Sequence, residues 1–168
     1  SEARRYEKHL KSGNAAKVAA IKAEYPNIEN VYKAYKDLRK LTLDIRKEAT
    51  KDWTKYSKKI KAYADSSGIK LTTKNREAVA SAALSFGEYQ EYSAASFLRK
   101  KDVLGKSNKL EDVSPEELIT YTLTGNQVRK YLEKKKVTSD GRIVSAFKAF
   151  IDKVITLLGV NPSSTNQT

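Results

Sequence analysis

The longest patterned stretch of the chain lies between residues 28 and 64, where apolar side chains recur every third or fourth residue. These apolar positions are Ile28, Val31, Tyr35, Leu38, Leu41, Ile45, Ala49, Trp53, Tyr56, Ile60 and Tyr63. A mean spacing of about 3.5 residues places such side chains on one face of a helix. We therefore predict one long amphipathic helix over 28–64, about 55 Å long at the standard rise per residue, with Gly68 just beyond its end.

Two shorter helices are predicted before it, over residues 2–11 and 14–24, on either side of the breaker Ser12-Gly13-Asn14. The second is rich in alanine, the residue with the highest helix propensity. Pro26 then ends it, since proline disfavours helical backbone before it. This N-terminal part is basic, and we expect it to form a helical arm over 1–26.

The rest of the chain shows little of the two-residue alternation that strands require. We predict a helix over 74–100 and a loop over 105–112. A further helix begins at Ser114-Pro115, breaks near 124–126 and is followed by a helix over 127–136. The last predicted helix covers 142–158, and Ser139-Asp140-Gly141 forms its start. The last is the most apolar stretch, too short to cross a bilayer, and is predicted to be the central buried helix of a bundle.

Together these patterns predict an all-α fold, a basic N-terminal helical arm plus a helix bundle. The predicted parts are the arm 1–26, a bundle over 27–160 that contains the long helix 28–64, and a polar tail over 161–168.

The net positive charge of the chain indicates a binding partner. The chain carries 33 Lys or Arg against 20 Asp or Glu, a net charge of +13. Residues 1–64 alone hold 17 bases and 8 acids. Such an excess repels itself in the compact state and favours a polyanionic partner: nucleic acid first, then an anionic membrane surface or an acidic protein. A solvated lysine-rich surface, common in proteins from hot environments, is the alternative.

In the first part of the chain the bases alternate with aromatic rings and repeat along the polar side of the long helix. Lysine and arginine neutralise phosphates without reading sequence, and no base-reading helix-turn-helix pattern is present. The predicted partner is therefore nucleic acid, contacted at its phosphates. Double-stranded DNA is the form we expect, with RNA as the alternative, because phosphate contacts alone do not distinguish the two. The candidate nucleic-acid-binding residues are Arg4, Arg5, Tyr6, Lys8, Lys11, Lys17, Lys22, Lys33, Lys36, Arg39, Lys40, Arg46, Lys47, Lys51 and Lys55.

Catalytic chemistry is not indicated. The chain has no cysteine and a single histidine, His9, and it lacks Gly-rich phosphate loops and hydrolase or zinc-protease motifs. Glu116-Glu117 is explained by the start of a helix. We expect no enzyme activity, no metal and no cofactor. Because alanine replaces bulky anchors in residues 2–24, insertion into a membrane is not expected either.

The layout resembles the major capsid proteins of rod-shaped and filamentous viruses of hyperthermophilic archaea. The ending from Phe150 to Pro162 is similar to their apolar closing helix and Pro-containing tail, and Ser67-Gly68-Ile69-Lys70-Leu71-Thr72 to their mid-chain turn. The resemblance implies a helical virion that is assembled in the host cytoplasm. In it, capsid dimers wrap DNA and keep it in A form. Each dimer contains two copies of this chain, or this chain and a related capsid protein. It also allows contact with an envelope. The small residue Ser1 is typical of a processed natural start, because serine in second position allows removal of an initiator methionine, and proteolytic maturation or a remnant of a tag are the alternatives.

A second resemblance covers about a quarter of the chain. Residues 117–123 and 147–160 are similar to the closing segment of helical domains in large polyvalent phage proteins. This would make the chain a fragment of a phage-delivered protein. A non-specific DNA-binding protein of this kind, or a cellular nucleoid-type one, acts without a shell and is the alternative function.

Overall fold

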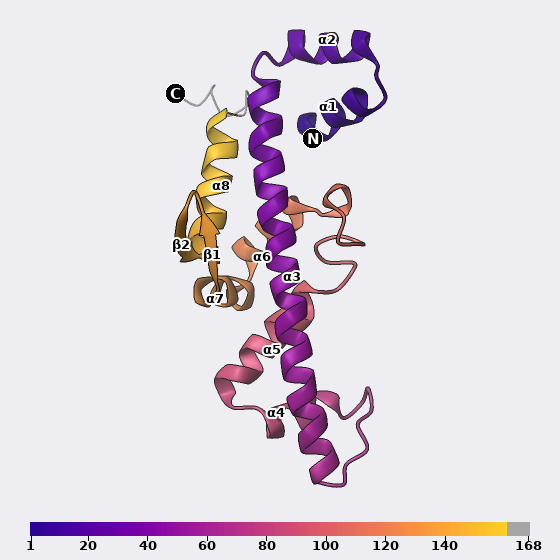
Figure 1. The fold of residues 1–168 in the computed structure, drawn as a ribbon, viewed down its shortest axis with the longest axis vertical. Helices are drawn as coiled ribbons and strands as arrows, with labels where there is room; N and C mark the ends of the chain where they lie inside the picture. Colours follow the sequence, from indigo (N-terminus) through magenta and orange to yellow (C-terminus); the bar gives the residue numbers. More distant parts are fainter. Residues whose placement is uncertain (161–168) are drawn as a thin grey trace. The chain divides into compact units, whose positions relative to one another are not determined.

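A computed structural model describes residues 1–160, so the predicted polar tail 161–168 lies outside the described residues. The elements are α1 (Glu2–Lys11), α2 (Ala15–Glu24), α3 (Ile28–Ser66), α4 (Arg76–Ala83), α5 (Phe86–Leu98), a 3-10 turn η1 (Leu110–Asp112), α6 (Pro115–Thr124), α7 (Asn126–Lys134), β1 (Lys136–Ser139), β2 (Arg142–Ser145) and α8 (Ala146–Val160) (Figure 1). The all-α class is confirmed, because the strands of the described part are the single pair β1 and β2.

The chain divides into two compact units. One, here called the terminal unit, contains residues 1–41 and the chain from 136 onward, and the other, the central unit, contains residues 42–135. The helix α3 contributes residues to both. These limits differ from those of the predicted arm, bundle and tail, which stay predictions.

The three N-terminal helices form where the sequence predicts them. The side chain of Ser1 accepts a hydrogen bond from the backbone N–H of Arg4, and that of Asn14 accepts one from Lys17, so both short helices have capped starts. In the terminal unit α1 and α2 pack on the first turns of α3 through the buried core Ala3, Tyr6, Ile21, Ile28, Val31 and Tyr35. The predicted long helix over 28–64 is confirmed as Ile28–Ser66.

The central unit has its own core. The later part of the α3 stripe packs there against α4 and α5, and this core contains Tyr56, Ile60, Ala64, Val79, Ala80, Leu84 and Tyr92. Trp53 lies at its edge, partly buried. The α6–α7 pair of the same unit breaks at Gly125, as predicted.

The prediction of one helix over 74–100 is wrong. The segment forms α4 and α5, separated at Leu84 and Ser85. The side chain of Ser85 accepts a hydrogen bond from the Glu88 N–H at 3.2 Å, and the Glu88 carboxylate accepts one from the Ser85 N–H at 3.0 Å. This reciprocal capping box starts a new helix and so ends the previous one.

The predicted start of the last helix is also wrong. Residues 136–145, which the pattern assigned to the ends of two helices, form an antiparallel hairpin in which Val137 pairs with Val144 and Thr138 with Ile143. Asp140 and Gly141 connect the strands with φ of 51° and 77°. Two successive positive φ angles make a type I′ turn, whose twist matches that of paired strands, and Asp-Gly favours it. β-Branched side chains on both strands add to the preference.

The prediction that the last helix is the central buried helix of a bundle is wrong as well. Ala146, Ala149 and Phe150 are buried, but Ile155 and Leu158 are 61% and 54% exposed. The helix α8 therefore packs on one face, after the hairpin that leads into it (Figure 1).

Substituting Gly141 by alanine tests the turn. A Cβ at φ of 77° is strained, so we expect Gly141→Ala to lower the free energy of unfolding by about 1–2 kcal/mol, measured by urea titration with far-UV circular dichroism. The control is Gly159→Ala in α8, where the added Cβ meets no atom within 4 Å. An equal loss in both variants would contradict the role of the turn.

Candidate nucleic-acid interface

The structure separates the predicted DNA-binding residues into groups by their surroundings. Three of them are buried: Tyr6, Arg39 and Arg46 are 4%, 5% and 4% exposed. Tyr6 belongs to the core of the terminal unit and contacts the ring of Tyr32 edge-on. These three side chains make intrachain contacts, and the surface described below is built without them.

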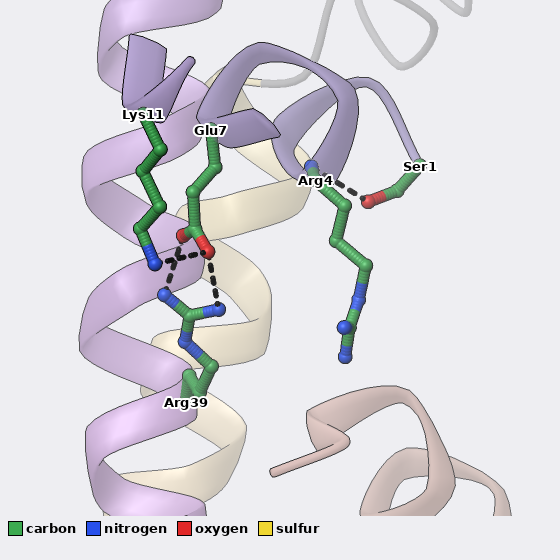
Figure 2. Close-up of polar contacts among 5 residues, drawn as sticks. All are labelled: Ser1, Arg4, Glu7, Lys11 and Arg39. Carbon is green, nitrogen blue, oxygen red and sulfur yellow. Dashed lines mark hydrogen bonds and ion pairs between the residues drawn. The ribbon is translucent and has the colours of Figure 1, made fainter. Parts of the chain in front are cut away.

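Arg39 on α3 is bonded to Glu7 on α1. Its two terminal nitrogens donate to the two carboxylate oxygens at 2.6 and 3.3 Å, and Lys11 approaches the same carboxylate at 3.3 Å (Figure 2). Burial by itself would raise the pKa of Glu7, but the hydrogen bonds and charge of Arg39 outweigh it and lower the pKa to about 2. This fork-to-fork pair holds α1 against α3.

Arg46, seven residues further along α3, is held in the central unit. One of its terminal nitrogens donates to the backbone carbonyl of Ser107 at 2.6 Å, and burial lowers its pKa. A guanidinium bonded to a neutral carbonyl in the chain fastens the segment between α5 and α6 to α3.

Three further candidates have acidic partners at the surface. Arg5 lies 3.3 Å from Glu24, Lys22 lies 2.8 Å from Glu29, and Lys11 lies beside Glu7. Exposed pairs of this kind are weak in water. A phosphate group would therefore have to compete with these carboxylates for the same cations.

Three other candidates stack on tyrosine rings. The cationic groups of Arg4, Lys36 and Lys55 lie 5.6, 4.5 and 4.6 Å from ring centroids. In Figure 2 the Arg4 side chain points away from the Glu7–Arg39 pair. Stacking on a ring leaves the ammonium donors of Lys36 and Lys55 open to an anion.

The remaining candidates are exposed lysines: Lys8, Lys17, Lys33, Lys40, Lys47 and Lys51. Within residues 1–160, all of these except Lys40 lack an acidic partner.

On α1 and α2 the positive charge concentrates around His9. Desolvation first, and then the charges of Lys17 and Lys8, lower the pKa of this histidine. A shallow depression of about 390 Å³ lies beside it, lined by His9, Leu10, Gly13, Ala15, Val18, Ala19 and Lys22. The two short helices thus present a depression with a positive rim.

On α3 the exposed lysines follow the helical period on the side away from the apolar stripe. In the terminal unit they are Lys33, Lys36 and Lys40. In the central unit they are Lys47, Lys51, Lys55 and Lys58, which we call the central lysine row. Spacings of three and four residues place the members of such a row on one side of the helix.

The sequence interpretation missed a buried ionic cluster in the central unit. Lys135 contacts both Asp52, at 2.6 Å, and Glu91. The hydroxyl of Tyr131 donates to Asp52 at 2.7 Å, and that of Tyr56 donates to Glu91 at 3.0 Å. A signal was present, because Asp52 follows Ala49 by three residues and so lies on the apolar side of α3. Burial comes first among the causes that raise the pKa of Tyr131, followed by Asp52.

The side chains of this cluster satisfy one another's hydrogen bonds and charges, as is typical of a polar network that stabilises a fold. Among the described residues no group of three or more His, Cys, Asp or Glu side chains is arranged to hold a metal ion. A search of the described helices finds none long and apolar enough to cross a membrane.

Comparisons with family models, with curated proteins and with solved structures found no match to this chain.

Proposed function

We infer that this protein is a non-enzymatic, structural DNA-binding protein that contacts the phosphates of double-stranded DNA. We propose that it is the capsid protein of a virus and packages the DNA in a helical filament, the virion. The observation that carries this proposal is the set of exposed lysines on α1, α2 and α3 that lack acidic partners in the described chain. Residues 1–64, which include these three helices, hold 17 bases against 8 acids, so most of their positive charge has no acidic counterpart in the same part of the chain.

Phosphate binding explains the arrangement physically. Each lysine that neutralises a phosphate releases condensed counterions from the duplex, which favours binding without any preference for sequence. Rows of lysines on helix faces suit this role, because a helix can follow a backbone with several side chains at once.

Assembly is supported by apolar side chains at the surface. In the terminal unit Ile143 is 77% exposed, and in the central unit Phe86 and Leu123 are 78% and 76% exposed. Large apolar groups of this kind favour burial against another protein surface. The partner we propose is a second copy of this chain or a related capsid protein, as in a filament built from dimers.

One observation favours the alternative of a DNA-binding protein that acts without a shell. Glu7 and Arg39 fasten α1 to α3, and a helix held in this way is less free to extend along DNA. Negative-stain imaging after nuclease digestion distinguishes the two. Filaments with protected DNA support the capsid proposal, and discrete DNA-bound particles support the alternative.

The salt dependence of binding tests the DNA proposal itself. We expect the triple variant Lys47→Gln, Lys51→Gln and Lys55→Gln to reduce the slope of log Kobs against log salt by about 2–3. Each lysine that leaves the interface removes roughly one phosphate contact. Fluorescence anisotropy of a labelled 30-base-pair duplex over a salt series measures this slope.

The control removes three lysines that each face a carboxylate in the structure. They are Lys61, which lies 3.0 Å from Asp65, Lys106, which lies 3.9 Å from Asp112, and Lys148, which lies 3.3 Å from Asp152. The same charge is lost, and the slope is expected to change by less than about 1. Equal slopes in the two triple variants would refute the central lysine row as the contact, and absent or salt-insensitive binding would refute the function.

A further inference from the structure

Two arginines of the central unit lie against the same tryptophan. The Cζ atom of Arg99, the residue that follows α5, is 3.8 Å from the centroid of the Trp53 ring, and that of Arg76, the first residue of α4, is 5.6 Å from it. All three side chains are partly exposed. The sequence interpretation singled out neither arginine.

The hydrogen bonds of Arg76 are donated to neutral groups. Arg76 donates through Nε to the hydroxyl of Tyr92 and through a terminal nitrogen to that of Ser57, both at 2.9 Å. The Nε of Arg99 is buried and has no hydrogen-bond partner. In the described part of the chain neither guanidinium makes a salt bridge.

Two acids of the same unit are bonded to lysines. On α5, Glu88 lies 2.6 Å from Lys59, and Glu91 contacts Lys135. Burial lowers the pKa of Arg99, and the positive charge of Arg76 acts in the same direction. Arg39 is paired with Glu7. Arg99 and Arg76, in contrast, place two positive charges beside one ring without a salt bridge in the described part of the chain.

A structural role accounts for only part of this arrangement. A single arginine stacked on Trp53 would supply the cation–π attraction, while a second guanidinium nearby adds repulsion that the fold does not offset. Two guanidiniums without a carboxylate partner are the chemistry that binds tetrahedral oxyanions, because the fork of N–H groups matches two oxygens of a phosphate.

We propose that Arg99 and Arg76 form a phosphate-binding site on the Trp53 ring, in which Arg99 donates to the phosphate oxygens and Arg76 adds a second positive charge. The ring orients the Arg99 guanidinium, so Trp53 is a positioning residue. The site itself is independent of the proposed function. That its phosphate belongs to a DNA backbone, and not to free phosphate or a nucleotide, rests on that function.

The chain carries its own reporter, because Trp53 is its only tryptophan. We expect sodium phosphate at pH 7 to change the Trp53 emission saturably, beyond the change with sodium chloride of equal ionic strength. Arg99→Gln is expected to weaken the apparent affinity at least tenfold, and Arg76→Gln several-fold. The matched control is Arg129→Gln in the same unit, an exposed arginine 3.7 Å from Glu133, which is expected to leave the response unchanged.

The outcomes separate this site from the DNA proposal. A duplex oligonucleotide that competes with phosphate for the emission change supports both. A phosphate response without competition by DNA supports the site and assigns it to a free phosphate or nucleotide. No saturable response to phosphate, or a response that Arg99→Gln leaves intact while circular dichroism shows a folded variant, overturns the site, even if anisotropy shows that DNA binds elsewhere on the protein.

Discussion

Lys135→Ala is expected to lower the free energy of unfolding of the central unit by about 3–5 kcal/mol. Lys135 is the cation between Asp52 and Glu91, so its removal leaves two carboxylates partly buried and facing each other. Breaking a buried pair on one side is far more destabilising than losing an exposed one. Urea titration followed by the emission of Trp53, which lies in the same unit, measures the loss.

The pH dependence gives this prediction a second readout. Burial would lower the pKa of Lys135, but the hydrogen bonds and charges of Asp52 and Glu91 raise it above its ordinary value of 10.5. A raised pKa means that the stabilisation is complete at neutral pH and is lost as the pH rises through the folded-state value. The Lys135→Ala variant is expected to lack this loss of stability at high pH.

Lys134→Ala is the matched control. This neighbouring lysine is exposed, so its loss is expected to change stability by less than about 0.5 kcal/mol. A similar loss in both variants, or a Lys135→Ala protein that is as stable as the parent, would show that the cluster does not stabilise the unit.

Glu7→Gln is expected to destabilise the terminal unit by about 3 kcal/mol. The glutamine keeps the shape of the side chain but leaves the buried Arg39 without an anion. Far-UV circular dichroism during a urea titration is the suitable measurement, since the single tryptophan lies in the central unit.

The sign with pH follows from the lowered pKa of Glu7. It stands at about 2 in the folded protein against an ordinary value of 4.5, so the stabilisation is complete above about pH 4.5 and is lost as the pH falls toward 2. The variant should lack this acid-sensitive step. The control is Glu24→Gln, whose partner Arg5 is exposed, and its expected cost is about 0–1 kcal/mol. Equal costs in the two variants would contradict the role of the buried pair.

The helices that the sequence predicts well are those whose signals are local. Helices α1, α2 and α3 have caps, breakers and a sustained apolar period within their own residues. The hairpin was missed because Asp140-Gly141 is also a plausible helix start, and four-residue strands give too short an alternation to recognise. The break before Ser85 depends on one reciprocal pair of hydrogen bonds, which an apolar pattern does not contain.

The candidate site shows the same division between sequence and tertiary contacts. The predicted polar side of α3 includes both exposed lysines and the buried arginines Arg39 and Arg46. Those two are seven residues apart and lie next to the apolar stripe, where Thr42 is also fully buried. The sequence shows that Arg39 and Arg46 are charged. It does not show their partners, Glu7 and the carbonyl of Ser107, which hold the two side chains inside the protein.

The hairpin also limits how copies of this protein can join. A sheet of two strands consists entirely of edges, and an unpaired edge is a template onto which another chain can add a strand. Here each strand is only four residues long and begins with an exposed cation, Lys136 or Arg142. Short, charged edges discourage such addition. Any assembly of this protein is therefore expected to grow through contacts between side chains and not through hydrogen bonds between the backbones of neighbouring copies.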